Sequence, residues 1–494
     1  MSEGCEPPPP SQEILLERVR GLEREVERLT AELSRREGGG KKRDREGEEK
    51  PRTPKSDGGK EQPDGKREGG GQQAVEEGAG SETGGVQNGA QDCGGHTPRS
   101  RKKSSQAREF DFGAHPRRHV ALRLSYHGWA YQGFACQENT GNTVEARLFE
   151  ALLKTRLIAD RQTSNYHRCG RTDKGVSAFS QVVSIDLRST QFGGGLGVTP
   201  PSCSSKNVSN SAELPYVKIL NRVLPEDIRV LDWAPVNTGF SARFDCQSRT
   251  YRYYFPRGAL DVPLMKTAAK RYEGTHDFRN LCKMDVGNGV LQFQRTILSA
   301  DITPVRSSCN PSDDPYDLFV FEVTGLAFLY HQVRCMMAVL LLIGQKLEAP
   351  EIIDQLLDVE NNPRKPQYSM AVDFPLVLYD CCFEGVSWQG GDSELSHSVL
   401  SRLQQQWTEL TVKTELVRDM IRGLHSAGHS STPLCSLLEG SRPRQYRPLL
   451  ERPCCESLES RIDHFVKRGR LERGESEEGG AVIHRGKKAK HTDS

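Results

Sequence analysis

The chain has 494 residues and a nearly balanced charge, with 68 Lys and Arg against 66 Asp and Glu. This length is enough for two or three domains. The balanced charge excludes a general attraction to nucleic acid, so an argument for RNA binding must rest on local basic clusters. The most apolar run, from Leu326 to Gly344, carries His331, Gln332 and Arg334, which argues against a membrane span.

The cysteines indicate free thiols. There are 14 of them in a large chain that opens with the acidic, Pro-rich stretch MSEGCEPPPP. A reducing compartment is therefore favoured over the disulfide framework of a small secreted protein. No CxxC pair occurs, so the sequence predicts no zinc site.

The first 109 residues contain no Phe, Trp or Tyr and therefore lack the material for an ordinary core. Residues 1–36 are predicted to form a short coiled coil, because apolar residues alternate at spacings of four and three at Leu15, Val19, Leu22, Val26, Leu29 and Leu33. With only about three heptads, the alternative is a marginal helix that pairs weakly or only with a partner. Residues 37–109 are predicted to be a disordered charged linker.

Residues 110–258 form the first half of the predicted catalytic region. Alternating apolar residues predict a strand over 119–126, and Thr143 precedes a predicted helix over 144–157. A β-branched strand over 176–187 follows, then a helix over 216–224 and strands over 228–233 and 250–255. Residues 189–212 are predicted to be a surface insertion. This element order indicates an α+β fold with helices on a sheet.

Residues 259–388 repeat a similar order. We expect a helix, strands over 293–303 and 318–323, and a long helix over 328–346. Residues 389–494 are predicted to hold an amphipathic helix and a polar tail. The helix has one apolar face, which packs on the core or on another subunit and is formed by Leu400, Leu403, Trp407, Leu410, Val417, Ile421 and Leu424.

Chemistry is concentrated in the stretch RCGRTDKGVSA, residues 168–178. Arg168, Arg171 and Lys174 flank a single carboxylate, Asp173, and we expect these cations to keep it ionised. Gly170 and Gly175 favour a tight loop that presents the acid. The competing interpretation is an ordinary polar turn whose Asp caps backbone groups.

The stretch GRTDKGVSA resembles the signature of the TruA-type tRNA pseudouridine synthases. The resemblance extends to YHGWAYQGFACQ, SARFDCQSRTYRYYF and FLYHQVRCMM, which occur in family order over about residues 118–385. It implies two related, ferredoxin-like α+β halves whose antiparallel sheets join around a central cleft. It also implies isomerisation of uridine in the tRNA anticodon arm, at about positions 38 and 39, without a metal or a cofactor.

The resemblance also implies roles for individual residues. Asp173 corresponds to the essential acid, as nucleophile or as the base that removes a sugar proton, and Arg171 to an arginine associated with base flipping. Tyr251 corresponds to the tyrosine that packs on the target uracil, although an aromatic residue in a strand is usually part of the core. Arg334 corresponds to the basic partner of the acid, so we expect a salt bridge between Arg334 and Asp173. The alternative is an exposed arginine that extends along the helix surface.

Basic residues near these motifs are the predicted contacts to substrate, namely Arg168, Lys174, Arg249 and Arg252, with Lys270 and Arg271 as further candidates. Such charges are often only a solvated surface. The resemblance suggests a homodimer that acts on tRNA. The basic clusters at 41–43 and 99–103 suggest the nucleus, with the cytoplasm as the alternative. Two other functions stay open: a sister synthase for another tRNA position, and an RNA-binding scaffold without catalysis.

Overall fold

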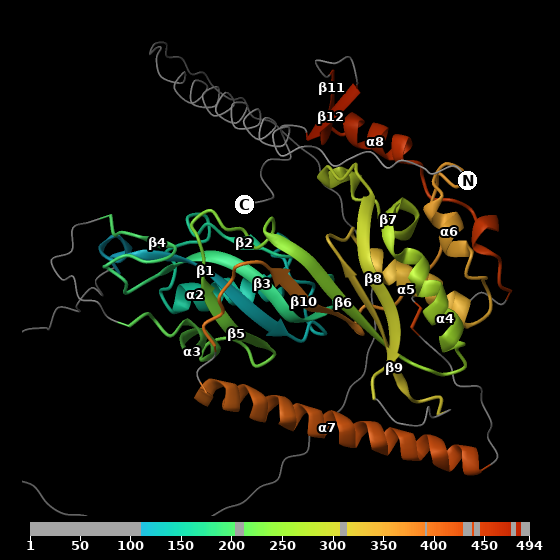
Figure 1. Ribbon diagram of the computed structural model, residues 1–494, viewed down its shortest axis with the longest axis horizontal. Helices are drawn as coiled ribbons and strands as arrows, with labels where there is room; N and C mark the ends of the chain where they lie inside the picture. The colour runs from blue at the N-terminus through green and yellow to red at the C-terminus, as the bar shows by residue number, and fades with distance from the viewer. Residues whose placement is uncertain are drawn as a thin grey trace, which may run out of the picture. The chain divides into compact units, whose positions relative to one another are not determined.

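A single ten-stranded sheet runs through the described part of the chain (Figure 1). The computed structural model describes residues 110–202, 212–306, 314–390, 393–427, 437–438, 445–475 and 481–485. The predicted coiled coil at 1–36 and linker at 37–109 lie outside these residues. The main path of the sheet follows the order β4 (Val198–Thr199), β1 (Arg117–Tyr126), β3 (Ser177–Arg188), β10 (Leu376–Phe383), β6 (Cys246–Pro256), β9 (Leu318–Gly325), β8 (Gln294–Pro304) and β7 (Gly274–Asp277).

Two further strands lie off this path. The short strand β2 (His167–Arg168) pairs with β3, and β5 (Ile228–Pro235) pairs with β1. All strand pairs of this sheet are antiparallel except that of β10 with β3. The prediction of an α+β fold is therefore confirmed at the level of a mostly antiparallel sheet with packed helices.

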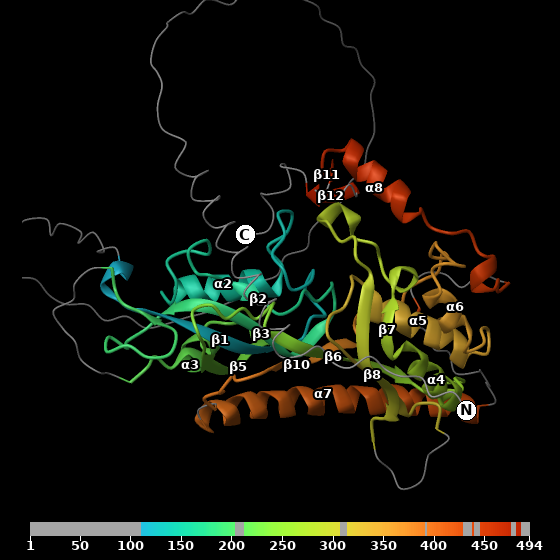
Figure 2. The ribbon, with the colours of Figure 1, turned by 45° about the horizontal axis from the view of Figure 1, so that its top comes forward.

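The helices divide between two hydrophobic cores. In Figure 2, α2 and α3 lie toward one end of the sheet, and α4, α5 and α6 lie toward the other. One core combines β1, β3 and β5 with α2 (Val144–Lys154) and α3 (Tyr216–Asn221). The other combines β6, β8 and β9 with α4 (Val262–Ala269), α5 (Gln332–Gly344) and α6 (Ile352–Leu357). The Thr143 side chain caps α2 by accepting from the Ala146 backbone N–H, as its sequence position predicted. Short 3₁₀ helices cover Phe112–Ala114, Lys270–Tyr272, Arg279–Leu281, Val286–Asn288 and Leu449–Glu451.

Strand β10 joins the two ends of the sheet. It pairs in parallel with β3 through Val377 opposite Ser177, and antiparallel with β6 through Leu378 opposite Tyr251. This strand was not among the predicted elements, and its partners lie more than a hundred residues earlier in the chain. The sheet is continuous because a strand from the end of the catalytic region inserts between strands from its first half.

Helix α5 begins later than predicted. Residues 328–331 are not helical, and His331 precedes the helix with a left-handed φ of 61°. Every residue of α5 is buried, including Arg334, whose exposed fraction is only 4%. The alternative of an exposed arginine on the helix surface is therefore wrong.

The C-terminal part contains α7 (Ser393–Ser426), α8 (Leu458–Lys467) and a hairpin of β11 (Leu471–Glu475) and β12 (Ala481–Arg485). The predicted amphipathic helix corresponds to α7, which runs alongside the sheet in both views (Figures 1 and 2). Arg402 pairs with Glu226, and Arg418 pairs with Asp314. No helix among the described residues is long and apolar enough to cross a membrane.

Candidate active site

The Asp173 loop connects β2 to β3 through a tight turn. The backbone N–H of Val176 donates to the carbonyl oxygen of Asp173 at 3.1 Å. Gly175 has a left-handed φ of 76°, and a Cβ at this position would lie 2.8 Å from the carboxylate carbon of Asp373. Glycine is needed here for both its backbone conformation and its lack of a side chain. The close approach of Gly175 to Asp373, which precedes β10, brings the Asp373 carboxylate near that of Asp173.

The loop is fixed on both sides of Asp173. The Gln181 amide on β3 exchanges two hydrogen bonds with the backbone of Gly170, at 2.9 and 3.2 Å. The Thr172 hydroxyl lies 2.7 Å from that of Tyr126 in a buried contact, and the Thr172 carbonyl accepts from the Phe134 backbone N–H at 3.1 Å. The YHGWAYQGF segment thus supports the Asp173 backbone.

The Asp173 carboxylate is largely withdrawn from solvent, with a side-chain exposed fraction of 20%. Burial raises its pKa to about 6, and the negative charge of Asp373 adds to this rise. The positive charges of Arg334 and Lys283 oppose it without cancelling it. At neutral pH the carboxylate is mostly ionised, with a pKa close enough to 7 for it to accept a proton efficiently.

The expectation that Arg168, Arg171 and Lys174 hold Asp173 strongly ionised is wrong. The Arg168 guanidinium instead donates to the carboxylate of Glu145 at 2.8 Å. The two cations that lower the Asp173 pKa, Arg334 and Lys283, come from distant parts of the chain. Proximity in sequence overstated the influence of the neighbouring basic residues, because Arg168 bonds to Glu145 and because Arg171 and Lys174 are exposed.

Arg334 connects α5 to the segment that precedes β10. Its Nε donates to the Ala371 carbonyl oxygen at 2.8 Å, and the Ala371 N–H donates to the Arg334 carbonyl oxygen at 3.3 Å. Its charge is the main favourable influence on the Asp173 carboxylate. The salt bridge between Arg334 and Asp173 stays a prediction that this electrostatic interaction supports.

His331 is a site residue that the sequence analysis did not single out. Its Nε2 lies 3.5 Å from a carboxylate oxygen of Asp173. Burial and the charges of Arg334, Lys283 and Lys365 lower the His331 pKa to about 3. The imidazole is therefore neutral at pH 7, and the contact is a long dipolar one rather than an ion pair. The available sequence signal was its position three residues before Arg334.

Tyr251 lies where the two hydrophobic cores meet, because it packs against both. Its ring makes an edge-on contact with Phe328, with centroids 5.0 Å apart. Burial raises the Tyr251 pKa well above its ordinary value, and the charge of Asp173 contributes to the rise. The phenol therefore stays protonated and is able to donate a hydrogen bond near Asp173.

The other predicted site residues either are exposed on the Asp173 loop or bond to other groups of the protein. Arg171 and Lys174 are exposed on the Asp173 loop. Arg249 donates to the carbonyl oxygens of Leu326, Cys169 and Arg243. Arg252 bonds to Glu322 at 2.5 Å and stacks on the Tyr379 ring, on the face of β6 opposite Tyr251. Lys270 and Arg271 form ion pairs with acidic residues, namely Glu273, Glu351 and Asp354.

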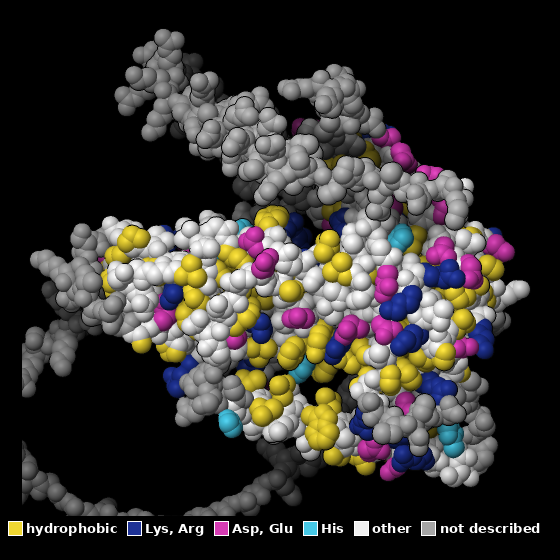
Figure 3. Space-filling view, viewed as in Figure 1, with side chains coloured by type: hydrophobic (Ala, Val, Ile, Leu, Met, Phe, Trp, Pro, Cys, Tyr) yellow, Lys and Arg dark blue, Asp and Glu magenta, His cyan; other side chains and the backbone are white. Residues whose placement is uncertain are grey.

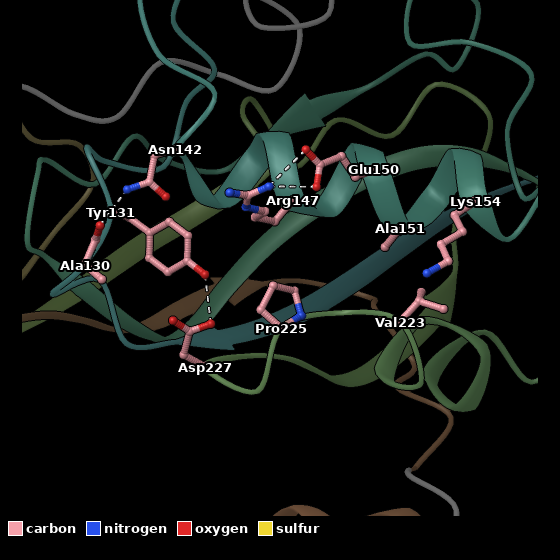
Figure 4. A pocket seen from close by; sticks show the side chains of 10 residues that line it. All are labelled: Ala130, Tyr131, Asn142, Arg147, Glu150, Ala151, Lys154, Val223, Pro225 and Asp227. Atoms are coloured by element: carbon pink, nitrogen blue, oxygen red, sulfur yellow. Dashed lines mark hydrogen bonds and ion pairs between the residues drawn. The ribbon is translucent and has the colours of Figure 1, made fainter. Parts of the chain in front are cut away.

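Neither the surface charge nor the pocket described here identifies the active site as clearly as the Asp173 loop does. On the face shown in Figure 3, Lys and Arg side chains are interspersed with Asp and Glu and form no single basic patch among the described residues. A pocket of about 470 Å³ lies between α2 and the α3–β5 connection, lined in part by Tyr131, Arg147 and Asp227 (Figure 4). Asp173 is not among its lining residues, so this pocket is separate from the candidate active site.

Comparison with known proteins places this site in a family. Residues 268–384 match the family model of the tRNA pseudouridine synthases. The chain is 56% identical over 387 residues to the Homo sapiens tRNA pseudouridine(38/39) synthase, covering 74% of this chain and 80% of that protein. It is 42% identical over 298 residues to the Saccharomyces cerevisiae tRNA pseudouridine(38/39) synthase, covering 59% and 63%. It is 28% identical over 305 residues to a Thermococcus onnurineus tRNA pseudouridine synthase A, covering 62% and 99%.

The sheet is mostly antiparallel and presents a largely buried carboxylate on a fixed loop. Together with these similarities, this arrangement defines the protein as an RNA-modifying isomerase. The chain belongs to the tRNA pseudouridine synthase family. It is a tRNA pseudouridine synthase enzyme, and its substrate is tRNA.

Proposed function

We propose that the uridines modified by this enzyme are those at positions 38 and 39 of the tRNA anticodon arm, and that Asp173 is the catalytic carboxylate. The position is supported by the mammalian relatives named for 38 and 39, which share 56% identity with most of this chain. The role of Asp173 is carried by one observation: burial raises its pKa to about 6 on a loop fixed from both sides.

The reaction is balanced without an external reactant. The bond from ring N1 to sugar C1′ breaks, a bond from ring C5 to C1′ forms, C5 loses its hydrogen, and N1 gains one. Asp173 acts either as a nucleophile at the sugar or as the base that removes a sugar proton. Both routes need the ionised carboxylate, so activity falls as pH drops through about 6.

Arg171 and Tyr251 are assigned to the target base. Arg171 is exposed two residues before Asp173, and its planar charged group suits the gap that an extruded base leaves in the stack. Tyr251 offers an aromatic ring for the uracil and a protonated phenol as a hydrogen-bond donor. Arg334 keeps the Asp173 carboxylate more ionised than burial alone would allow.

Contacts to the tRNA backbone begin at the same loop. Lys174 is exposed beside Asp173 and is free to approach a phosphate. Arg168, Arg249 and Arg252 already bond to protein acceptors, so their contribution to tRNA affinity comes mainly from shaping the surface. Binding should weaken steeply as salt rises, because phosphate contacts release counterions.

The finer architecture and the assembly follow the family resemblance. The two cores correspond to two related, ferredoxin-like halves with the catalytic cleft between them, and β10 and Tyr251 lie at their junction. We assign a homodimer, which a coiled coil at residues 1–36 would reinforce. The basic clusters of the N-terminal region favour a nuclear location, which imaging of the tagged full chain would test.

Tritium release from tRNA labelled at uracil C5 tests the proposal, because forming the new carbon bond expels that hydrogen. The unaltered chain should release tritium, and Asp173→Asn should not. Replacing both U38 and U39 of the tRNA by cytidine should abolish release. Release from the doubly replaced tRNA would indicate a sister specificity. Binding of tRNA without release by the unaltered chain would favour the non-catalytic scaffold.

A further inference from the structure

Three cysteines that are far apart in the sequence meet in the interior beside the Asp173 loop. The Sγ atoms of Cys169, Cys246 and Cys381 all lie within 4.8 Å of one another. Those of Cys169 and Cys381 are 3.3 Å apart. All three are buried, with exposed fractions of 4%, 9% and 4%. Cys169 follows β2, Cys246 begins β6, and Cys381 lies on β10, so the cluster connects three separate segments.

A partly buried positive charge adjoins this cluster. Arg249 is the direct cross-strand neighbour of Cys381 in the pairing of β6 with β10. Its Nη2 donates to the Cys169 carbonyl oxygen at 3.2 Å and to the Arg243 carbonyl oxygen at 3.0 Å, and its Nη1 donates to that of Leu326 at 2.6 Å. These acceptors are neutral, whereas a partly buried guanidinium is best stabilised by a nearby negative charge. The three thiols are well placed to supply that charge if they lose their protons.

The distances fit a shared metal ion. Zinc binds thiolate sulfur at about 2.3 Å, which places the sulfurs of one site about 3.7–4.0 Å apart. The Cys169–Cys381 separation of 3.3 Å lies slightly below this value, and no pair of the three is more than 4.8 Å apart, so small side-chain rotations suffice. A disulfide would require one pair of sulfurs at about 2.05 Å and would leave the third thiol unused.

We propose that Cys169, Cys246 and Cys381 bind one Zn²⁺ ion as three thiolates. Binding releases three thiol protons, and the resulting site carries a net charge of about −1, which the Arg249 cation balances. Thiolate sulfur is a soft ligand that favours zinc over magnesium or calcium. No fourth His, Cys, Asp or Glu ligand joins the group within the part of the chain that the structure describes.

The site would hold the active-site elements together. Cys169 lies on the Asp173 loop, Cys246 is on the strand that carries Tyr251, and Cys381 is on the strand that joins the two cores. The metal would thus position the carboxylate relative to the tyrosine without contacting the substrate. No local sequence pattern indicated this site, because zinc sites are recognised by short cysteine spacings and these three residues are separated by whole elements.

Metal content provides the direct test. The full-length chain, expressed with zinc available and purified without chelators, should contain about one zinc per chain by inductively coupled plasma mass spectrometry. Cys381→Ser and Cys246→Ser should lower this at least about tenfold. Cys382→Ser is the matched control, because Cys382 is adjacent but exposed, and it should retain the metal. A zinc content below about a tenth per chain, or full retention in Cys381→Ser, would overturn the proposal.

A second measurement covers the case in which the serine variants do not fold. Cd²⁺ added to the unaltered, metal-depleted chain should produce a thiolate-to-cadmium charge-transfer band in the ultraviolet that saturates at about one ion per chain. Pretreatment with a thiol-alkylating reagent under unfolding conditions should abolish the band. No band with the folded chain, or a disulfide between Cys169 and Cys381 in freshly isolated protein, would also overturn the proposal.

Discussion

Two carboxylates that are largely withdrawn from solvent, those of Glu145 and Asp173, have pKa values shifted in opposite directions. The Glu145 side chain is completely buried, yet it accepts from Arg168 at 2.8 Å, from Arg161 at 2.9 Å and from the Cys136 backbone N–H at 2.8 Å. Burial raises its pKa, but these partners outweigh burial, so the net pKa is lowered. For Asp173, burial outweighs Arg334 and Lys283, and the pKa rises to about 6.

The difference distinguishes a structural acid from a reactive one. A carboxylate with three direct donors has its lone pairs engaged and contributes to stability while it is ionised. Asp173 has weaker partners, such as the neutral His331 at 3.5 Å, so its charge is stabilised less and remains available to a substrate. Arg168 belongs to the same sequence motif as Asp173, but its guanidinium bonds to Glu145.

The largest expected effect is the loss of catalysis in Asp173→Asn. Turnover should fall at least about 10²–10⁴-fold, because the reaction loses its carboxylate. Tritium release under single-turnover conditions measures this. The folded state should not be weakened at pH 7 to 8. A raised folded-state pKa contributes stability only at low pH, and this contribution is lost as pH rises through about 6. A variant that keeps more than a few per cent of activity would contradict the assignment.

Glu145→Gln should show the reverse pattern. It leaves two arginines without a carboxylate, and the free energy of unfolding should fall by about 2–3 kcal/mol, below the full cost of a buried pair because both arginines are partly exposed. Urea denaturation at pH 7.5 measures this. The difference from the unaltered chain should shrink as pH falls, because a lowered folded-state pKa contributes stability only above the unfolded pKa. Turnover of the folded fraction should change little, and a selective loss of turnover would break the comparison.

Arg334→Gln should move the acid side of the activity profile. Glutamine keeps a donor for the Ala371 carbonyl but removes the positive charge, so the Asp173 pKa should rise further. The midpoint at which kcat/KM falls should therefore move upward from about 6, by about one unit. Arg334→Lys is the matched control that keeps the charge and should stay near the original profile. A profile unchanged in the glutamine variant would mean that Arg334 does not act through Asp173.

The smallest expected effect is that of Lys283→Met. Its cation also lowers the Asp173 pKa, but the side chain is exposed and screened by solvent. The acid side of the profile should shift upward by a fraction of that seen with Arg334→Gln, and added salt should remove the difference. His331→Asn is the control, because the imidazole is already neutral near pH 6 and asparagine tolerates a left-handed backbone. A shift in the control as large as that of Lys283→Met would refute this ranking.

The sequence by itself determined the elements that local patterns specify. Alternating apolar residues identified β1, β-branched residues identified β3, and Thr143 marked the start of α2. The stretch GRTDKGVSA placed an acid on a loop before a strand. These features depend on residues close together in the chain, whose periodicity and turn chemistry are visible without any partner.

Only the tertiary structure decided the electrostatics and the joining of the sheet. Arg168 lies in the same short stretch of sequence as the acid but bonds elsewhere, whereas Lys283 and Arg334, far away in sequence, act on it. The pairing of β10 with β3 and the cluster of Cys169, Cys246 and Cys381 depend on contacts between residues that are far apart in the chain. Burial, which sets the Asp173 pKa, is a property of everything packed around a side chain, and a short stretch of sequence does not contain it.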